Sequence, residues 1–174
     1  MLIFASAPSG LLCPENYKKG QAIIMNQVTL SIQSKLANAR LAALCAKEMA
    51  ANYFTEAEQA EIEIAVAETI NNSIEHACAG SEDHTIAITY SLNNFYLSID
   101  VKDNGKTFES NGLEDLDAEF NFDPDDFDSL PESGMGLKII KSCMDKVLYQ
   151  NTEMQNHWLL IKFRPAHEGV NKTV

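Results

Sequence analysis

The residues from Glu61 to Cys78, EIEIAVAETINNSIEHAC, contain the feature that most restricts how this chain can fold. At about 100° per residue its apolar side chains fall on one arc, which predicts an amphipathic helix that covers a core. Because Glu68, Asn72 and His76 are spaced four residues apart, they are expected to line up along one edge of that arc. The apolar positions of the arc are Ile62, Val66, Ile70, Ile74 and Ala77.

The pair Asn71-Asn72 is unusual for the middle of a helix, because an Asn side chain competes with the backbone for hydrogen bonds. Two interpretations stay open at this point. The pair lies on a solvated flank, or the Asn72 carboxamide works together with the Glu68 carboxylate in a site. His76 is better explained as a structural histidine than as a ligand contact.

Length and composition predict a single domain over residues 26–165, after an N-terminal arm or extension (1–25) and before a polar tail (166–174). With 25 acidic and 13 basic residues and no Lys/Arg-rich run, the chain is not expected to bind nucleic acid directly. No apolar run reaches the roughly 18 residues of a membrane helix, and the apolar start lacks the positive charges of a signal peptide. The widely spaced cysteines indicate reduced thiols of a cytoplasmic protein; they are Cys13, Cys45, Cys78 and Cys143.

A strand and a helix are predicted before the central helix. Alternation over residues 28–32 predicts a strand with one buried face, and helix-forming residues dominate from Ser34 to about Ala51. Thr55 and Glu58 form a capping box, which predicts the start of the central helix. The broad apolar arc of the first helix consists of Leu36, Leu41, Leu44 and Cys45.

After the central helix, alternation over residues 86–90 and 95–101 predicts an antiparallel hairpin. A third helix is predicted from Ser133, and two last strands are predicted around 146–151 and 158–163. The apolar positions of this third helix are Leu137, Ile140, Met144 and Val147. These elements predict an α/β fold, a two-layer sandwich with helices on one face of a mainly antiparallel sheet.

Three features lie in the connections of this fold. The second hairpin strand runs into Asp103-Asn104-Gly105, which alone is most simply a turn. Residues 107–133 contain ten acidic residues and no Lys or Arg, and this length favours a functional lid. Within this segment, the acidic piece DPDDFD (123–128) is not expected to be an EF-hand calcium loop, because Pro124 breaks the ligand alternation and the piece has no glycine for the sharp turn. The glycines of Ser133-Gly134-Met135-Gly136 precede a helix, whose free N–H groups favour a phosphate.

In this order, the stretches resemble the N-box and the two glycine boxes of the GHKL ATPases. The nearest resemblance is to the anti-sigma-factor serine/threonine kinases, whose pattern is similar to EIEIAVAETINNSIEHA, VKDNGKTFE and SGMGLKIIKSCMDKV in this chain. The resemblance covers Val28 to Phe163 and implies the two-layer sandwich of the GHKL (Bergerat) type. It also implies ATP and Mg²⁺ as ligands.

The resemblance implies a role for several residues. Glu68 would be the general base, and Asn72 would give its amide oxygen to Mg²⁺. Asp103 would accept a hydrogen bond from the adenine amino group, and Gly105 would let the base approach the backbone. The second glycine box would shape the hinge of the lid and direct N–H groups at the phosphates. The remaining residues of the implied nucleotide site are Phe108, Gly134, Met135, Gly136, Leu137 and Lys138.

The function implied by the resemblance is a partner switch: a homodimeric kinase that sequesters a sigma factor and phosphorylates a STAS-type antagonist protein. One departure concerns Glu132, because some relatives have an Arg there, and a cation near the transferred phosphate greatly raises the rate. Nucleotide binding is therefore the firmer expectation. The alternative is a non-catalytic ATP-binding module that sequesters a partner. The catalytic domain of a sensor histidine kinase is less favoured, since no His or dimerisation helix pair precedes the predicted fold.

Overall fold

The computed structural model describes residues 23–106, 135–152 and 155–165. Most of the predicted arm, the whole lid and the polar tail lie outside the described residues. The strands are β1 (Ile24–Gln33), β2 (Thr85–Asn93), β3 (Tyr96–Asp103), β4 (Lys146–Thr152) and β5 (Gln155–Phe163). The helices are α1 (Leu36–Ala50), α2 (Glu56–Asn72), a π-helical turn η1 (Ser73–Ala77) and α3 (Met135–Cys143).

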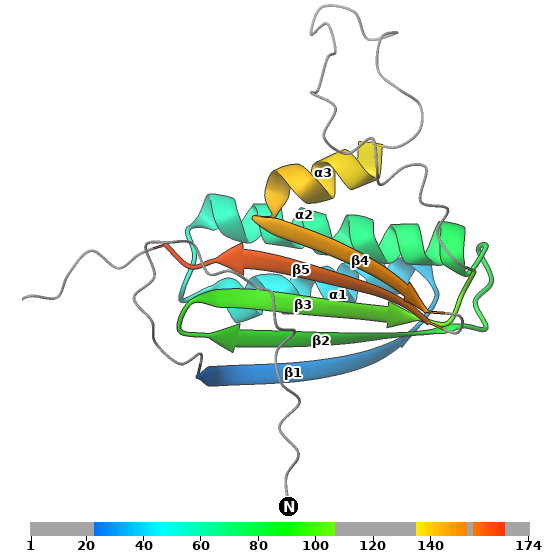
Figure 1. Cartoon of the computed structure of the whole chain (residues 1–174), viewed down its shortest axis with the longest axis horizontal. Helices are drawn as coiled ribbons and strands as arrows, with labels where there is room; N and C mark the ends of the chain where they lie inside the picture. Colours follow the sequence, from blue (N-terminus) through cyan, green and yellow to red (C-terminus); the bar gives the residue numbers. More distant parts are fainter. Residues whose placement is uncertain (1–22, 107–134, 153–154, 166–174) are drawn as a thin grey trace, which may run out of the picture.

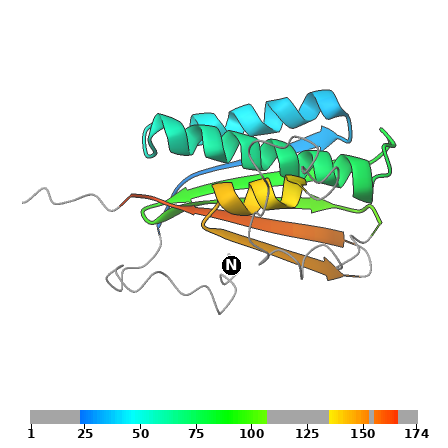
Figure 2. The same cartoon turned by 90° about the horizontal axis from the view of Figure 1, so that it is seen from above.

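The strands form one five-stranded sheet in the order β1-β2-β3-β5-β4, and every neighbouring pair is antiparallel. Figure 1 shows the sheet from β1 at the bottom to β4 at the top, and Figure 2 shows the helices gathered on one side of it. Helix α2 lies in the middle of the helical layer, in contact with both α1 and α3. The predicted two-layer α/β sandwich is therefore confirmed. In the part of the chain that the structure describes, no helix is both long and apolar enough to span a membrane.

The core lies between the sheet and α2, as the sequence periods predict. All five apolar positions of the predicted arc of the central helix are buried. All of them except Ala77 pack with inward-facing side chains of the central strands, among which Trp158 and Tyr90 are the largest. The predicted capping box is also confirmed, because the Thr55 hydroxyl accepts from Glu58 N–H while the Glu58 carboxylate accepts from Thr55 N–H. The start of α2 is thereby fixed at Glu56.

The predicted apolar arc of α1 is wrong at three of its four positions, whereas the fourth, Cys45, is half-buried and packs against the core. The side chains of α1 that enter the core are Ala39, Ala42, Ala43, Ala46 and Ala50. Leu36, Leu41 and Leu44 are exposed by 58%, 55% and 43% respectively. Small side chains let the backbone of α1 approach α2 and the sheet closely, and the hydroxyl of Tyr90 donates to the carbonyl of Ala42 at 2.8 Å. Close approach of the backbone, and not the size of the side chains, therefore decides which face is buried.

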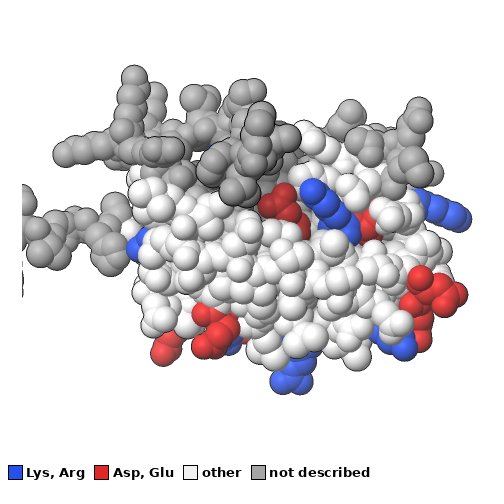
Figure 3. All heavy atoms as spheres, turned by 90° about the horizontal axis from the view of Figure 1, so that it is seen from below, with Lys and Arg blue, Asp and Glu red and all other residues white. Residues whose placement is uncertain are grey.

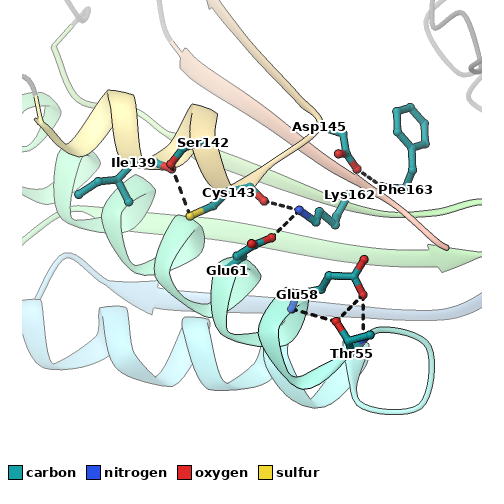
Figure 4. A network of polar contacts seen from close by, with 9 residues as sticks. All are labelled: Thr55, Glu58, Glu61, Ile139, Ser142, Cys143, Asp145, Lys162 and Phe163. Carbon is teal, nitrogen blue, oxygen red and sulfur yellow. Dashed lines mark hydrogen bonds and ion pairs between the residues drawn. The ribbon is translucent and has the colours of Figure 1, made fainter. Parts of the chain in front are cut away.

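Helix α3 is joined to α2 and β5 by one buried cation, Lys162 (Figure 4). Its ammonium group donates to the Glu61 carboxylate of α2 at 2.7 Å and to the Cys143 carbonyl at 2.8 Å. Cys143 is the last residue of α3, where a cation is favoured by the free carbonyl groups and the negative end of the helix dipole. This contact holds α3 against the helix that carries Glu68 and Asn72.

The prediction that Val147 belongs to the third helix is wrong, because α3 ends at Cys143 and Val147 lies in β4. The backbone N–H of Asp145 already bonds to the carbonyl of Ile161, so the chain pairs with β5 directly after the helix. Met144, another of the predicted helix positions, is buried beyond the helix end.

Candidate nucleotide site between α2, the Asp103 turn and α3

Glu68 and Asn72 lie one turn apart on α2, and both are half-buried. The start of α3 lies directly against them. A Cβ atom placed on Gly136 would lie 3.0 Å from Glu68 Oε2 and 3.3 Å from Asn72 Oδ1. Any side chain at position 136 would therefore press on the carboxylate and the carboxamide. The structure thus brings together the second glycine box and the polar edge of the central helix, which are more than 60 residues apart in the chain.

The helix changes its geometry directly after Asn72. The backbone N–H of Cys78 bonds to the carbonyl of Ser73, five residues back, as in a π-helix. This wider turn ends the four-residue line that the sequence predicts through His76, and His76 is exposed. The Asn72 amide nitrogen and the Ser73 hydroxyl are buried and have no hydrogen-bond partner within the described residues. Single π-helical turns often occur at functional sites.

The turn after β3 packs on this π-helical turn. A Cβ atom on Gly105 would lie 2.3 Å from both the carbonyl carbon and the carbonyl oxygen of Ala77, which is impossible without a backbone shift. The N–H of Lys106 donates to the same carbonyl oxygen at 2.7 Å. Only glycine fits at position 105, because the backbone of the central helix occupies the place of a side chain. The Asp103 turn is thereby fixed to the end of the helix that carries Asn72.

The Asp103 carboxylate is buried, with 1% of the residue exposed. Its Oδ1 accepts from the N–H of Gly105 at 3.0 Å and from the Asn156 amide at 2.7 Å. Its Oδ2 is also buried and has no hydrogen-bond partner within the described residues. Burial raises the pKa of the Cys78 thiol, and the negative charge of Asp103 raises it further. A buried acceptor without a partner is costly, so this oxygen fits a ligand that brings an N–H donor.

The other predicted site residues differ in their surroundings. Leu137 is buried in the core, whereas Met135 and Lys138 are half-buried in the first turn of α3. Phe108, Gly134 and Glu132 lie outside the described residues.

Sequence reasoning missed Asn156, which bonds directly to Asp103 from β5. One signal was present. The inward positions of β5 alternate as Asn156, Trp158, Leu160 and Lys162, so a polar residue begins and ends an otherwise apolar face.

The sheet is covered on one face, and polar groups gather at α2, α3 and the Asp103 turn. This layout is that of a histidine kinase-like ATPase domain. The family model described as "Histidine kinase-like ATPase domain" matches residues 32–162. The chain therefore belongs to the histidine kinase-like ATPases and, within them, to the family of anti-sigma-factor serine kinases, as the following relatives show.

The chain is 32% identical over 130 residues to "Serine-protein kinase RsbW" of Listeria monocytogenes serovar 1/2a, covering 72% of this chain and 80% of that protein. It is 29% identical over 131 residues to "Anti-sigma F factor" of Clostridium botulinum, a match that covers 72% of this chain and 85% of that protein. A crystal structure of the RsbU and RsbW domains of Rv1364c from Mycobacterium tuberculosis has a similar fold, with a TM-score of 0.51 at 15% identity. That match covers 81% of this chain and 34% of the solved chain. The resemblance noted in the sequence is confirmed.

Proposed function

We propose that this chain is a cytoplasmic serine/threonine protein kinase that uses ATP and Mg²⁺, phosphorylates a STAS-type antagonist protein and sequesters a sigma factor. The observation that carries the proposal is the buried oxygen of Asp103 that has no hydrogen-bond partner among the described residues. An oxygen in this state suits the amino group of adenine, which is a donor. The names of the relatives support a kinase and anti-sigma role.

The residues of α2 would serve the phosphate end of the nucleotide. When bound, Mg²⁺ neutralises negative charge on the phosphate oxygens. Asn72 is the residue proposed to hold the ion through its amide oxygen. Its buried amide nitrogen has no hydrogen-bond partner within the described residues and would donate to a phosphate oxygen. Glu68, one turn earlier, would take the proton from the attacking Ser or Thr hydroxyl. Gly136 leaves room above both side chains, since a Cβ atom there would contact them.

Repulsion between negative charges would release the phosphorylated antagonist from this chain. Phosphorylation adds about −1.5 to −2 charge at pH 7. Because this chain has a formal net charge of −12, a phosphorylated antagonist would be repelled more strongly than the unmodified protein.

The proposed magnesium role of Asn72 gives a first test. Calorimetric titration of the wild type is expected to show tighter binding of ADP with Mg²⁺ than with EDTA. Asn72→Ala is expected to lose most of this dependence, because the amide oxygen that would bind the ion is removed. Asn71→Ala is a matched control, since it removes an identical carboxamide one position away on α2 and should leave the dependence intact. A wild type that binds no nucleotide contradicts the proposal.

The proposed homodimer would form through an apolar surface at the free edge of the sheet, here called the edge patch. Within the described residues no strand pairs with the outer edge of β1, and unpaired edges favour strand addition. Figure 3 shows this side of the molecule, where charged side chains are sparse. For a chain of net charge −12, a face with few charged side chains, among them the exposed Arg40 of α1, is where a second copy meets least repulsion. The patch consists of Ile24, Met25, Val28, Leu36, Leu41 and Leu44, all exposed.

A charge placed in the edge patch is expected to separate the copies. Leu41→Lys combined with Leu44→Lys should convert a wild-type dimer into a monomer in analytical ultracentrifugation, because two apolar contacts would be replaced by buried cations. The affinity for ADP should stay within about twofold, since neither side chain enters the core. A monomeric wild type at micromolar concentration, or a variant that remains dimeric, rules out this surface.

A further inference from the structure

Asn156 has every hydrogen-bonding group of its side chain in use. It lies on β5 directly opposite Asp103 in the sheet register, and 1% of the residue is exposed. Its amide nitrogen donates to Asp103 Oδ1 at 2.7 Å and to the Lys106 carbonyl at 2.9 Å. Its amide oxygen accepts from the Tyr149 hydroxyl at 2.7 Å and from the Asn151 amide at 2.6 Å. A carboxamide has two donors and two acceptor positions, so this group is saturated.

The partners on both sides of the Asn156 amide fix its orientation. Tyr149 and Asn151 both direct N–H or O–H groups at its oxygen. If the amide rotated by 180°, its oxygen would face the Asp103 carboxylate and the Lys106 carbonyl, which only accept hydrogen bonds, and its nitrogen would face the donating amide of Asn151. That orientation is strongly disfavoured, so the nitrogen is kept toward Asp103. The orientation of the amide follows from the network of contacts around it.

Fixing Asn156 in turn fixes Asp103. Oδ1 of the carboxylate already receives two donors, the N–H of Gly105 and the amide of Asn156. The rotation of the carboxylate is thereby set, and Oδ2 is the oxygen left without a partner among the described residues. An ionised carboxylate oxygen only accepts hydrogen bonds. It therefore suits the 6-amino group of adenine and is repelled by the 6-oxo group of hypoxanthine.

We propose that Asn156 is a positioning residue that makes this site selective for 6-amino purine nucleotides, acting through Asp103. The inference rests on the proposed function, since it assumes that the site holds the base. Sites that hydrogen-bond a ligand group reject analogues lacking it much more strongly than apolar pockets do. Without Asn156, the Asp103 carboxylate can rotate, and its free oxygen is then no longer held toward the place of the 6-amino group.

Calorimetric titration with ADP and with inosine diphosphate tests this inference, because the two ligands differ at the base and share the same phosphates. Asn156→Leu is expected to weaken ADP binding about tenfold to a hundredfold, the range of one buried hydrogen bond to a charged group. Binding of inosine diphosphate should change much less, so the preference for ADP should fall at least about tenfold. A purely structural role would lower both affinities by the same factor.

A second variant keeps Asn156 in place and removes two of the four hydrogen bonds that hold its amide. Tyr149→Phe combined with Asn151→Ala removes both donors to the amide oxygen and should lower the preference for ADP by a smaller factor. This variant decides the question if Asn156→Leu does not fold. Gln150→Ala is the control, because this exposed residue of β4 lies between the two donors and should leave both affinities unchanged.

The outcomes separate the inference from the proposed function. A wild type that binds ADP no better than inosine diphosphate, or whose ADP affinity survives Asp103→Asn, overturns both. If the wild type prefers ADP and Asp103→Asn abolishes that preference, the site stands. In that case, only the positioning role of Asn156 remains to be tested. It is overturned if Asn156→Leu folds and keeps the wild-type ratio of ADP affinity to inosine diphosphate affinity. If Asn156→Leu does not fold, the same result with the double variant overturns it.

Discussion

Replacing Glu68 with Gln is expected to lower the rate of phosphoryl transfer from ATP to a STAS-type antagonist by about a hundredfold or more. Gln has the same shape, so its contact with Gly136 and its place beside Asn72 would persist. What is lost is the ability to take the proton from the attacking hydroxyl. Binding of ADP should therefore stay within about twofold. Transfer of labelled phosphate from ATP to the antagonist, with calorimetry of ADP binding, measures both quantities.

The matched control for this prediction is Glu56→Gln, which removes one exposed carboxylate from the first turn of the same helix. It should leave the transfer rate unchanged. If Glu68→Gln transfers phosphate as fast as the wild type, Glu68 is not the base. If the wild type binds ATP and its partner without any transfer, the chain is the non-catalytic module that sequesters a partner.

The arrangement of helices and strands was largely predictable from the spacing of apolar residues along the chain. Strands with alternating apolar residues need one buried face, and the arc from Ile62 to Ala77 needs a core to cover, so a one-sided sandwich follows. The burial of α1 was not predictable in the same way. Both its leucine side and its alanine side are apolar, and periodicity alone cannot say which one contacts α2. Alanine is favoured on the buried side because it allows two helices to approach closely.

The candidate site was predictable only where its residues are close in sequence or follow a known order of motifs. Glu68 and Asn72 share one face of a helix, so their proximity follows from four-residue spacing. Asn156 was not predictable, because its partner Asp103 is 53 residues away and the contact depends on the register of β3 and β5. Register is set by the whole sheet. The π-helical turn after Asn72 has no recognised local signal and was missed for that reason.

A glycine was expected at position 105, but the structure gives a different reason for it. The resemblance implies that a glycine there lets the adenine base approach the backbone. In the structure the place of a side chain is taken by the Ala77 carbonyl, 2.3 Å from an ideal Cβ atom. The glycine is therefore needed even without a ligand, since it allows the Asp103 turn to pack on the end of the central helix.

Gly105→Ala is consequently expected to lower the free energy of unfolding by about 3 kcal/mol, at the upper end of the range for overpacking. The clashing atoms belong to the backbone of Ala77, so no side-chain rotation relieves the contact. The shift would also pull on the hydrogen bond from Lys106 to Ala77 and displace Asp103, so ADP binding should weaken at least about tenfold. Urea unfolding without nucleotide measures the first effect, and calorimetry measures the second.

The control for this last prediction is Gly80→Ala, at a glycine that is needed for a different reason. Gly80 has a φ of +71° and nothing within 4 Å of an ideal Cβ atom, so alanine there adds backbone strain without a clash. The cost should be about 1 kcal/mol, with ADP affinity unchanged. If Gly105→Ala is no more destabilising than Gly80→Ala and still binds ADP normally, the close packing of the Asp103 turn on Ala77 does not hold the site together. A large loss of ADP affinity at Gly105 alone means that the base is placed by this backbone contact.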